Sequence, residues 1–165
     1  MHLPPLPTQS ELNNQFLEAA QRGDIAAISL LLKAPEIDIN FKNRFGRTAL
    51  LLAIQYKHIH IVKTLLAAGA DINISQGAPL RMAMMHNDIA TITLLFSIKD
   101  LLVNQLDREG YTALMYAAEK GELAVIRSIL NAPRLDINLN IASRLTQETA
   151  LMLAIRGGHI EVIKA

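Results

Sequence analysis

The chain has no cysteine and no tryptophan, and only 4% of its residues are aromatic. Without cysteine, disulfide bonds and thiolate metal sites are excluded. The lack of cysteine also fits a reducing compartment. We therefore expect a cytoplasmic protein, or one delivered to a host cytosol if the source is a bacterium that acts inside host cells.

Net charge and long apolar runs are equally scarce. The formal net charge is only +1, which gives no overall attraction to nucleic acid or to a membrane surface. Polar residues such as Gln55 and Lys63 interrupt the apolar stretches, which stay well short of the roughly 20 apolar residues of a membrane span. Residues 1–7 (MHLPPLP) do not have the pattern of a secretory signal, and their prolines predict a flexible, extended arm. We expect neither nucleic acid nor membrane among the partners.

What the chain does contain is an internal repeat. Residues 43–73 read NRFGRTALLLAIQYKHIHIVKTLLAAGADIN, and residues 107–138 read DREGYTALMYAAEKGELAVIRSILNAPRLDIN. A leucine in the same register recurs at Leu50, Leu80, Leu114 and Leu151, a spacing of about 33 residues that is typical of stacked repeats. Such repeats present a long surface rather than a catalytic cleft. The pattern favours a binding scaffold.

Each repeat is predicted to hold two short helices. Thr48 can cap the first helix of its repeat, and Ile61, Val62 and Leu65 have helical spacing in the second. Gly69 suits the left-handed residue that ends this second helix. At the start of the chain, Thr8 and Glu11 form a T-x-x-E capping box.

On these residues the chain resembles the ankyrin-repeat family over residues 8–165. The motifs GRTALLLAI (46–54), GADIN (69–73), GYTALMYAA (110–118) and AIRGGHIEVI (154–163) recur in one register and carry the resemblance. It implies an all-α solenoid, a single domain of stacked helix–turn–helix repeats joined by β-hairpin-like finger loops. The repeats would be 8–40 (a capping-type repeat), 41–73, 74–104, 105–138 and an incomplete 139–165.

Two departures from the family pattern stand out. Only four residues, 74–77, are available for the finger of the third repeat, where Ala-Pro-Leu (78–80) replaces Thr-Ala-Leu. At the other end, Ile160, Val162 and Ile163 resemble an interior pattern that is cut short. Either the chain is a fragment of a longer protein, which we favour, or something else covers this end.

The sequence contains no pattern that predicts catalysis. A nucleophile motif, a glycine-rich phosphate loop and a paired His–Glu spacing are all missing, so we expect no enzyme, no cofactor and no small-molecule substrate. His58 and His60 lack carboxylate partners at metal-ligand spacing, so we expect no metal. The resemblance implies that His58 bonds locally to support the turn between its helices. Asp38, Asp71 and Asp136 are interpreted as turn-forming residues.

The resemblance also implies that a partner protein contacts the finger tips and the exposed side of the first helices, which together form the concave face. The matched positions are Arg44, Phe45, Arg47, Tyr56, Arg81, Met85, His86, Arg108, Tyr111, Lys120 and Arg156. Basic residues outnumber the nearby acids Glu109 and Glu119, which predicts a partner with an acidic or mixed acidic-apolar surface. In the alternative interpretation, the charged side chains simply solvate this face, and Tyr56 or Met85 packs between helices.

Two functions remain open. The first is a non-catalytic scaffold that binds a partner protein. The second is an N-terminal targeting module of a longer protein or enzyme whose catalytic part lies beyond residue 165. Nucleic-acid binding through the same arginines is not favoured, because the bulk charge is low and there is no stacking pattern.

Overall fold

Every regular element of the described chain is a helix. The computed structural model describes residues 8–132 and 136–165, so the expected arm of residues 1–7 lies outside it. Within those ranges there are helices and one isolated β-bridge, between Ala142 and Thr149, which confirms the all-α fold. The chain divides into two compact units, Met1–Asp71 (unit 1) and Ile72–Ala165 (unit 2), which are described separately. The expectation of a single domain over residues 8–165 stays a prediction.

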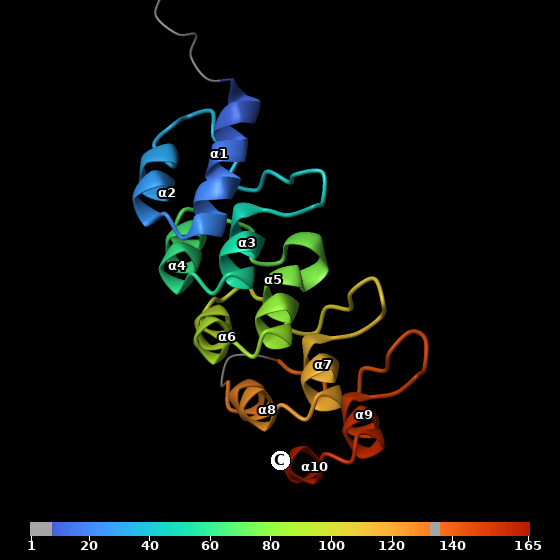
Figure 1. Cartoon of the computed structure of the whole chain (residues 1–165). Helices are drawn as coiled ribbons and strands as arrows, with labels where there is room; N and C mark the ends of the chain where they lie inside the picture. The colour runs from blue at the N-terminus through green and yellow to red at the C-terminus, as the bar shows by residue number, and fades with distance from the viewer. Residues whose placement is uncertain (1–7, 133–135) are drawn as a thin grey trace, which may run out of the picture. The chain divides into compact units, whose positions relative to one another are not determined.

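Unit 1 is built from two helix pairs (Figure 1). Its helices are α1 (Gln9–Arg22), α2 (Ile25–Leu31), α3 (Ala49–Gln55) and α4 (Ile59–Ala67). Helix α1 packs against α2 and α3, and α4 packs against α2 and α3. The fully buried side chains include Phe16, Ile28, Leu50, Ile54 and Leu65. The repeat therefore buries its aliphatic stripe between neighbouring helices, as the spacing predicts.

The predicted caps of unit 1 are present. The Thr8 hydroxyl accepts a hydrogen bond from the Glu11 amide at 3.3 Å, and the Glu11 carboxylate accepts one from the Thr8 amide at 2.7 Å. Thr48 accepts from the Leu51 amide at 3.2 Å at the start of α3. Because the first amides of a helix have no partner inside it, these side chains decide where α1 and α3 begin.

Unit 2 arranges its helices in two rows. They are α5 (Ile74–Met85), α6 (Ile89–Phe96), α7 (Ala113–Glu119), α8 (Leu123–Leu130), α9 (Ala150–Arg156) and α10 (Ile160–Lys164). Helices α5, α7 and α9 form one row, and α6, α8 and α10 form the other (Figure 1). The loops before α7 and α9 project from the first row, away from the second. These loops are the finger loops expected from the resemblance.

The third repeat has no projecting finger. Ser75, Gln76 and Gly77 have φ values of 53°, 60° and 72°, so they form a left-handed turn before the right-handed part of α5. Pro79 follows at the start of that right-handed part, where a missing N–H costs nothing. Left-handed backbone costs about 1–2 kcal/mol at each non-glycine residue. The four-residue segment is thus compact, but it is held under strain at Ser75 and Gln76.

Asparagine side chains join one repeat to the next. In unit 1, Asn40 Oδ1 accepts a hydrogen bond from the Asp71 amide at 2.9 Å. In unit 2, Asn73 Oδ1 accepts from the Leu102 amide, and Asn104 Oδ1 accepts from the Asn138 amide, both at 2.9 Å. These asparagines lie in turns, and the described residues contain no strand beside them. Each asparagine therefore satisfies a backbone amide of the next repeat that has no partner in a sheet.

The turn role of Asp38 is confirmed, because its carboxylate accepts from the Asn40 amide at 3.0 Å.

The expected local role of His58 is wrong. His58 Nε2 lies 3.1 Å from the carbonyl oxygen of Gln21, in the preceding repeat, and His159 Nε2 lies 2.8 Å from that of Glu119. A carbonyl oxygen only accepts, so Nε2 carries the proton in both rings. These histidines connect successive helix pairs rather than support their own turn.

The asparagine contacts yield a stability prediction. Asn104→Ala removes the acceptor for the Asn138 amide and the donor to the Asp136 carbonyl, which is 2.6 Å away. We expect a loss of about 1–3 kcal/mol in the free energy of unfolding, measured by urea denaturation. Asn14→Ala, on the exposed side of α1, is the matched control. Equal midpoints for the two variants would contradict the role of Asn104.

Candidate functional site

The finger of unit 1 is a hairpin closed by one side chain. Asn43 Oδ1 accepts from the Phe45 amide at 2.9 Å and from the Arg47 amide at 3.0 Å. The Asn43 amide in turn donates to the Arg47 carbonyl at 3.1 Å. Gly46, with φ of 71°, makes the reversal that L side chains rarely adopt. The finger is thereby fixed with Phe45 at its tip.

Phe45 and Arg44 form a basic and aromatic tip on this finger. The Phe45 side chain is 71% exposed, and the Arg44 guanidinium carbon lies 4.7 Å from the centre of its ring. That distance is within the range of a cation–π contact. Residues 41–47 contain three basic side chains and no acidic one. The tip therefore presents a positive charge beside an uncovered ring.

Tyr56 lies at the end of α3 in the same unit and remains partly exposed. Its hydroxyl accepts from Gln21 Nε2 at 3.3 Å, and its ring stacks on that of His58 with centroids 6.3 Å apart. The residue as a whole is still 45% exposed. Tyr56 is therefore held by neighbouring side chains without being buried between helices.

The first finger of unit 2 is closed in the same way by Asp107. Asp107 Oδ1 accepts from the Glu109 and Tyr111 amides, both at 2.9 Å. The Asp107 amide donates to the Tyr111 carbonyl, also at 2.9 Å. Asp107 thus occupies the place that Asn43 has in unit 1, but it brings a negative charge that must be neutralised.

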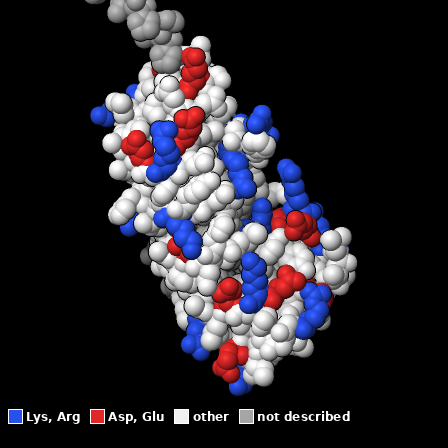
Figure 2. All heavy atoms as spheres, in the orientation of Figure 1, with Lys and Arg blue, Asp and Glu red and all other residues white. Residues whose placement is uncertain are grey.

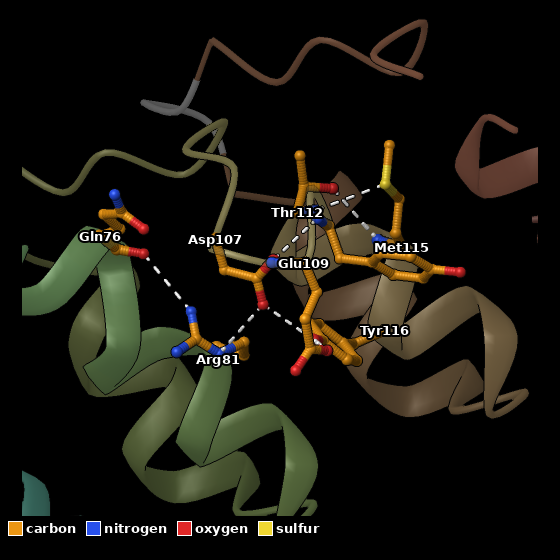
Figure 3. A network of polar contacts seen from close by, with 8 residues as sticks. Gln76, Arg81, Asp107, Glu109, Thr112, Met115 and Tyr116 are labelled. Atoms are coloured by element: carbon orange, nitrogen blue, oxygen red, sulfur yellow. Dashed lines mark hydrogen bonds and ion pairs between the residues drawn. The ribbon is translucent and has the colours of Figure 1, made fainter. Parts of the chain in front are cut away.

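The second carboxylate oxygen of Asp107 has two partners from neighbouring helices (Figure 3). Asp107 Oδ2 lies 3.5 Å from Arg81 Nε on α5 and accepts from the Tyr116 hydroxyl of α7 at 2.8 Å. The Asp107 side chain is 5% exposed and that of Arg81 is 25% exposed. Arg81 also donates to the Gln76 carbonyl at 3.5 Å. Arg81, expected on an exposed helix side, is instead turned onto a buried carboxylate.

Tyr116 is shared between two carboxylates. Its hydroxyl lies 2.8 Å from Asp107 Oδ2 and 2.9 Å from Glu109 Oε2, although it has only one proton to donate. Burial and then these two carboxylates raise the pKa of Tyr116 well above its ordinary value of 10. The ring of Tyr111 lies 5.2 Å from that of Tyr116. The base of this finger is therefore a rigid polar network.

The remaining candidate residues of unit 2 divide into paired and exposed ones. Arg156 binds Glu119 at 3.0 Å and Glu148 at 2.8 Å. Over unit 2, Figure 2 shows basic and acidic side chains intermingled. The candidates with exposed side chains are Met85, His86, Arg108 and Lys120. The expected basic excess is therefore partly cancelled by ion pairs in this unit.

Sequence analysis missed the Asp107 network. Asp107 precedes Thr112 by the same interval that separates Asn43 from Thr48, so its backbone role could have been inferred by comparing the repeats. Tyr116 stands at a position in the first helix of its repeat that is apolar in the other repeats, where it is Leu52, Met82 or Leu153. A hydroxyl at such an apolar position predicts a buried acceptor for its hydrogen bond.

No group of three or more histidine, aspartate or glutamate side chains converges as metal ligands in residues 8–132 and 136–165. None of the helices in that part of the chain combines the length and the apolar character needed to cross a membrane.

The recurring finger closure and helix pairs agree with the comparison with known families. The family described as ankyrin repeats (3 copies) matches residues 16–103 and 80–165. The chain belongs to the ankyrin-repeat family. Ankyrin repeats generally mediate interactions between proteins.

Relatives of this ankyrin-repeat protein are diverse in length. The putative ankyrin repeat protein YahD of Escherichia coli (strain K12) is 33% identical over 126 residues, which are 74% of this chain and 62% of the relative. The ankyrin repeat and KH domain-containing protein mask-1 of Caenorhabditis elegans is 30% identical over 92% of this chain, which corresponds to 6% of its own length. The chain thus spans about three fifths of the first relative and a small part of the second.

Substitution of Arg81 tests whether this residue has a structural role rather than a role in binding. Arg81→Ala leaves the nearly buried Asp107 carboxylate without its cation, so we expect the free energy of unfolding to fall by about 1–3 kcal/mol. Arg108→Ala, at an exposed position of the same finger, should change it by less than about 0.5 kcal/mol. Thermal and urea unfolding measure both variants. Equal stability of the two would contradict the ion pair.

The shared phenol of Tyr116 predicts a pH dependence. Its pKa is raised in the folded chain above the ordinary value of 10, so its contribution to stability is complete below pH 10 and is lost as the pH rises further. Absorbance of tyrosinate should show a group that ionises above the ordinary pKa of a tyrosine. Tyr116→Phe should remove this late component and flatten the fall in stability above pH 10. A wild-type titration with a single step near 10 would contradict the network.

Proposed function

We propose that this ankyrin-repeat chain is a scaffold that binds a partner protein through its finger tips and the ends of its first helices. The observation that carries the proposal is the Arg44–Phe45 tip, where a guanidinium lies 4.7 Å from the centre of an exposed ring. Arginine and aromatic residues are enriched among the few residues that carry most of the binding energy of an interface. The partner would offer a carboxylate next to an apolar side chain.

The rigidity of the finger supports this assignment. Asn43 holds the amides of Phe45 and Arg47, so the loop is ordered before any partner arrives. A preordered loop loses less conformational entropy on binding than a flexible one. Residues 41–47 also contain no acidic side chain that could offset the charge of Arg44. The tip can therefore direct both its ring and its charge toward the same partner group.

The contribution of unit 2 would differ in character. Arg108 and Lys120 are exposed and supply positive charge, whereas Met85 and His86 at the end of α5 supply apolar and polar contact. Tyr111 is half-buried on its finger, where its amide is held by Asp107. In this proposal Arg81 and Arg156 act mainly by positioning neighbouring carboxylates.

A second candidate is a targeting module within a longer protein. It is favoured by the small share of some relatives that the chain spans, such as 7% of the leucine-rich repeat serine/threonine-protein kinase 1 of Caenorhabditis elegans, at 27% identity. In that case the surface described above would direct an activity carried elsewhere. A full reading frame in which no catalytic domain adjoins these residues would exclude this candidate.

The binding proposal predicts a specific loss of affinity. Partners captured by the wild-type chain are identified by mass spectrometry, purified, and titrated by calorimetry. Phe45→Ala should weaken the complex at least about 30-fold, as expected for an aromatic hot spot of about 2 kcal/mol. Arg44→Glu should weaken it and also reduce its salt dependence.

The matched control is Lys63→Glu, the same type of charge reversal on an exposed residue of α4 in the same repeat. The control should keep wild-type affinity, and all variants should keep the wild-type melting temperature. A complex that tolerates Phe45→Ala and Arg44→Glu as well as it tolerates Lys63→Glu would refute the assigned surface.

A further inference from the structure

An open groove of about 600 Å³ lies where the two second helices of unit 1 begin. Ile25 and Ile59, the first residues of α2 and α4, both line it, and these helices pack against each other (Figure 1). None of its described lining residues belongs to the finger of residues 41–47 or to unit 2. The groove is therefore a surface of unit 1 that is separate from the finger tip.

Basic side chains dominate the polar part of this groove. Lys57, His60 and Lys63 line it and are exposed, and none of its described lining residues is acidic. Asp24, next to the lining in sequence, caps α2 by accepting from the Ala27 amide at 2.9 Å. The groove thus presents more positive than negative charge, which attracts carboxylates.

Two of the basic residues are special to the repeat of residues 41–73. Lys57 stands where three of the other repeats have glycine and one has Asn87. His60 stands where three of the other repeats have alanine and one has Glu161. The corresponding glycines are Gly23, Gly121 and Gly158, and the alanines are Ala26, Ala90 and Ala124. The repeat fold therefore requires neither basic side chain at its position.

Lys57 also adopts a backbone conformation that its side chain disfavours. Its φ of 59° lies in the left-handed region, as do the values of 79°, 71° and 68° of the glycines at the same position. A residue with a Cβ is strained there, and asparagine tolerates the region better than lysine does. Strain that the fold does not require is typical of functional positions. The conformation therefore favours a role for this lysine in binding.

The apolar part of the groove is aliphatic and held in place. Ile25 is 41% exposed, and Ile59 is partly exposed. The ring of His58, also in the lining, donates from Nε2 to the Gln21 carbonyl at 3.1 Å and stacks on Tyr56. An aliphatic surface suits a leucine or isoleucine side chain, whereas nucleic-acid bases stack on aromatic platforms. The groove therefore fits a protein segment better than a nucleic acid.

From these observations we infer that the groove binds a short acidic segment of a partner protein. Carboxylates of the segment contact Lys57 and Lys63, and an aliphatic side chain between them packs on Ile25 and Ile59. The charges guide the segment to the groove, and the burial of the aliphatic side chain adds affinity. The groove and the finger tip bind different segments, so this inference does not depend on the proposed function.

A titration of the ¹⁵N-labelled chain, followed by NMR, tests the inference. The probe is a synthetic peptide with blocked ends, in which two aspartates stand on each side of a leucine. We expect shifts of the amide signals of residues 23–25 and 57–64, with a dissociation constant no weaker than about one millimolar. Glycine in place of the leucine of the peptide should raise the dissociation constant at least about fivefold.

Lys57→Gly removes the ammonium group and the backbone strain together. The dissociation constant should rise at least about threefold, whereas the melting temperature should stay the same or increase. The matched control is Asn87→Gly, which makes the same backbone change in the third repeat and should leave peptide binding unchanged. Combining Lys57→Gly with Lys63→Glu should weaken the peptide at least about tenfold. Lys63→Glu is expected to leave the finger tip unaffected, so the two surfaces are distinguished by the same variant.

No amide shifts in the groove at several millimolar peptide would overturn the inference. Equal affinity of Lys57→Gly and the wild-type chain would also overturn it, as would a marked fall in melting temperature for Lys57→Gly but not for Asn87→Gly, because the lysine would then be structural. A single-stranded oligonucleotide that shifts the same amides when the peptide does not would assign the groove to nucleic acid instead. Loss of finger binding in Phe45→Ala is measured independently, so either proposal can fail alone.

Discussion

Hydrogen bonds from side chains to the backbone between repeats are the constraint on which the rest of this structure depends. In the described residues no sheet satisfies the turns that connect the short helix pairs, so Asn40, Asn73 and Asn104 provide acceptors for amides of the next repeat. Asn43 and Asp107 do the same within the fingers. Burial of leucine and isoleucine supplies most of the stability. The asparagine contacts fix the register in which that burial occurs.

The repeat period and the capping threonines made the fold predictable, because both depend on residues close together in sequence. Thr8, Glu11 and Thr48 act within three residues of their position. The Arg81–Asp107 pair could not be predicted in this way, since it joins side chains 26 positions apart whose proximity depends on how α5 packs against α7. The left-handed turn at Ser75–Gly77 was also missed. The sequence shows that this segment is short, but the conformation of its backbone depends on the elements that the segment connects.

The exposed positions of the candidate surface could be predicted from the sequence better than its balance of charge. Matched positions correctly indicated exposed side chains at Phe45, Tyr56 and Met85. Counting basic residues overstated the free charge, because Arg81 and Arg156 are held by Asp107 and Glu148, which that count did not include. Charge on a repeat surface is therefore a property of contacts between neighbouring repeats. At the tip of the first finger, the Arg44 guanidinium instead lies 4.7 Å from the centre of the exposed Phe45 ring.

The histidine bonds between repeats couple positions that lie far apart in the chain. A side chain added at Gly23 would come within 2.8 Å of the His58 ring, and Gly121 meets the ring of His159 in the same way. Where the third and fourth repeats carry Asp88 and Glu122 instead of histidine, no ring proton exists to reach a carbonyl. In this chain glycine and histidine therefore occur as pairs across successive repeats. Replacing the histidine would relax the demand for a small residue one repeat earlier, whereas a larger residue in place of the glycine would displace the ring.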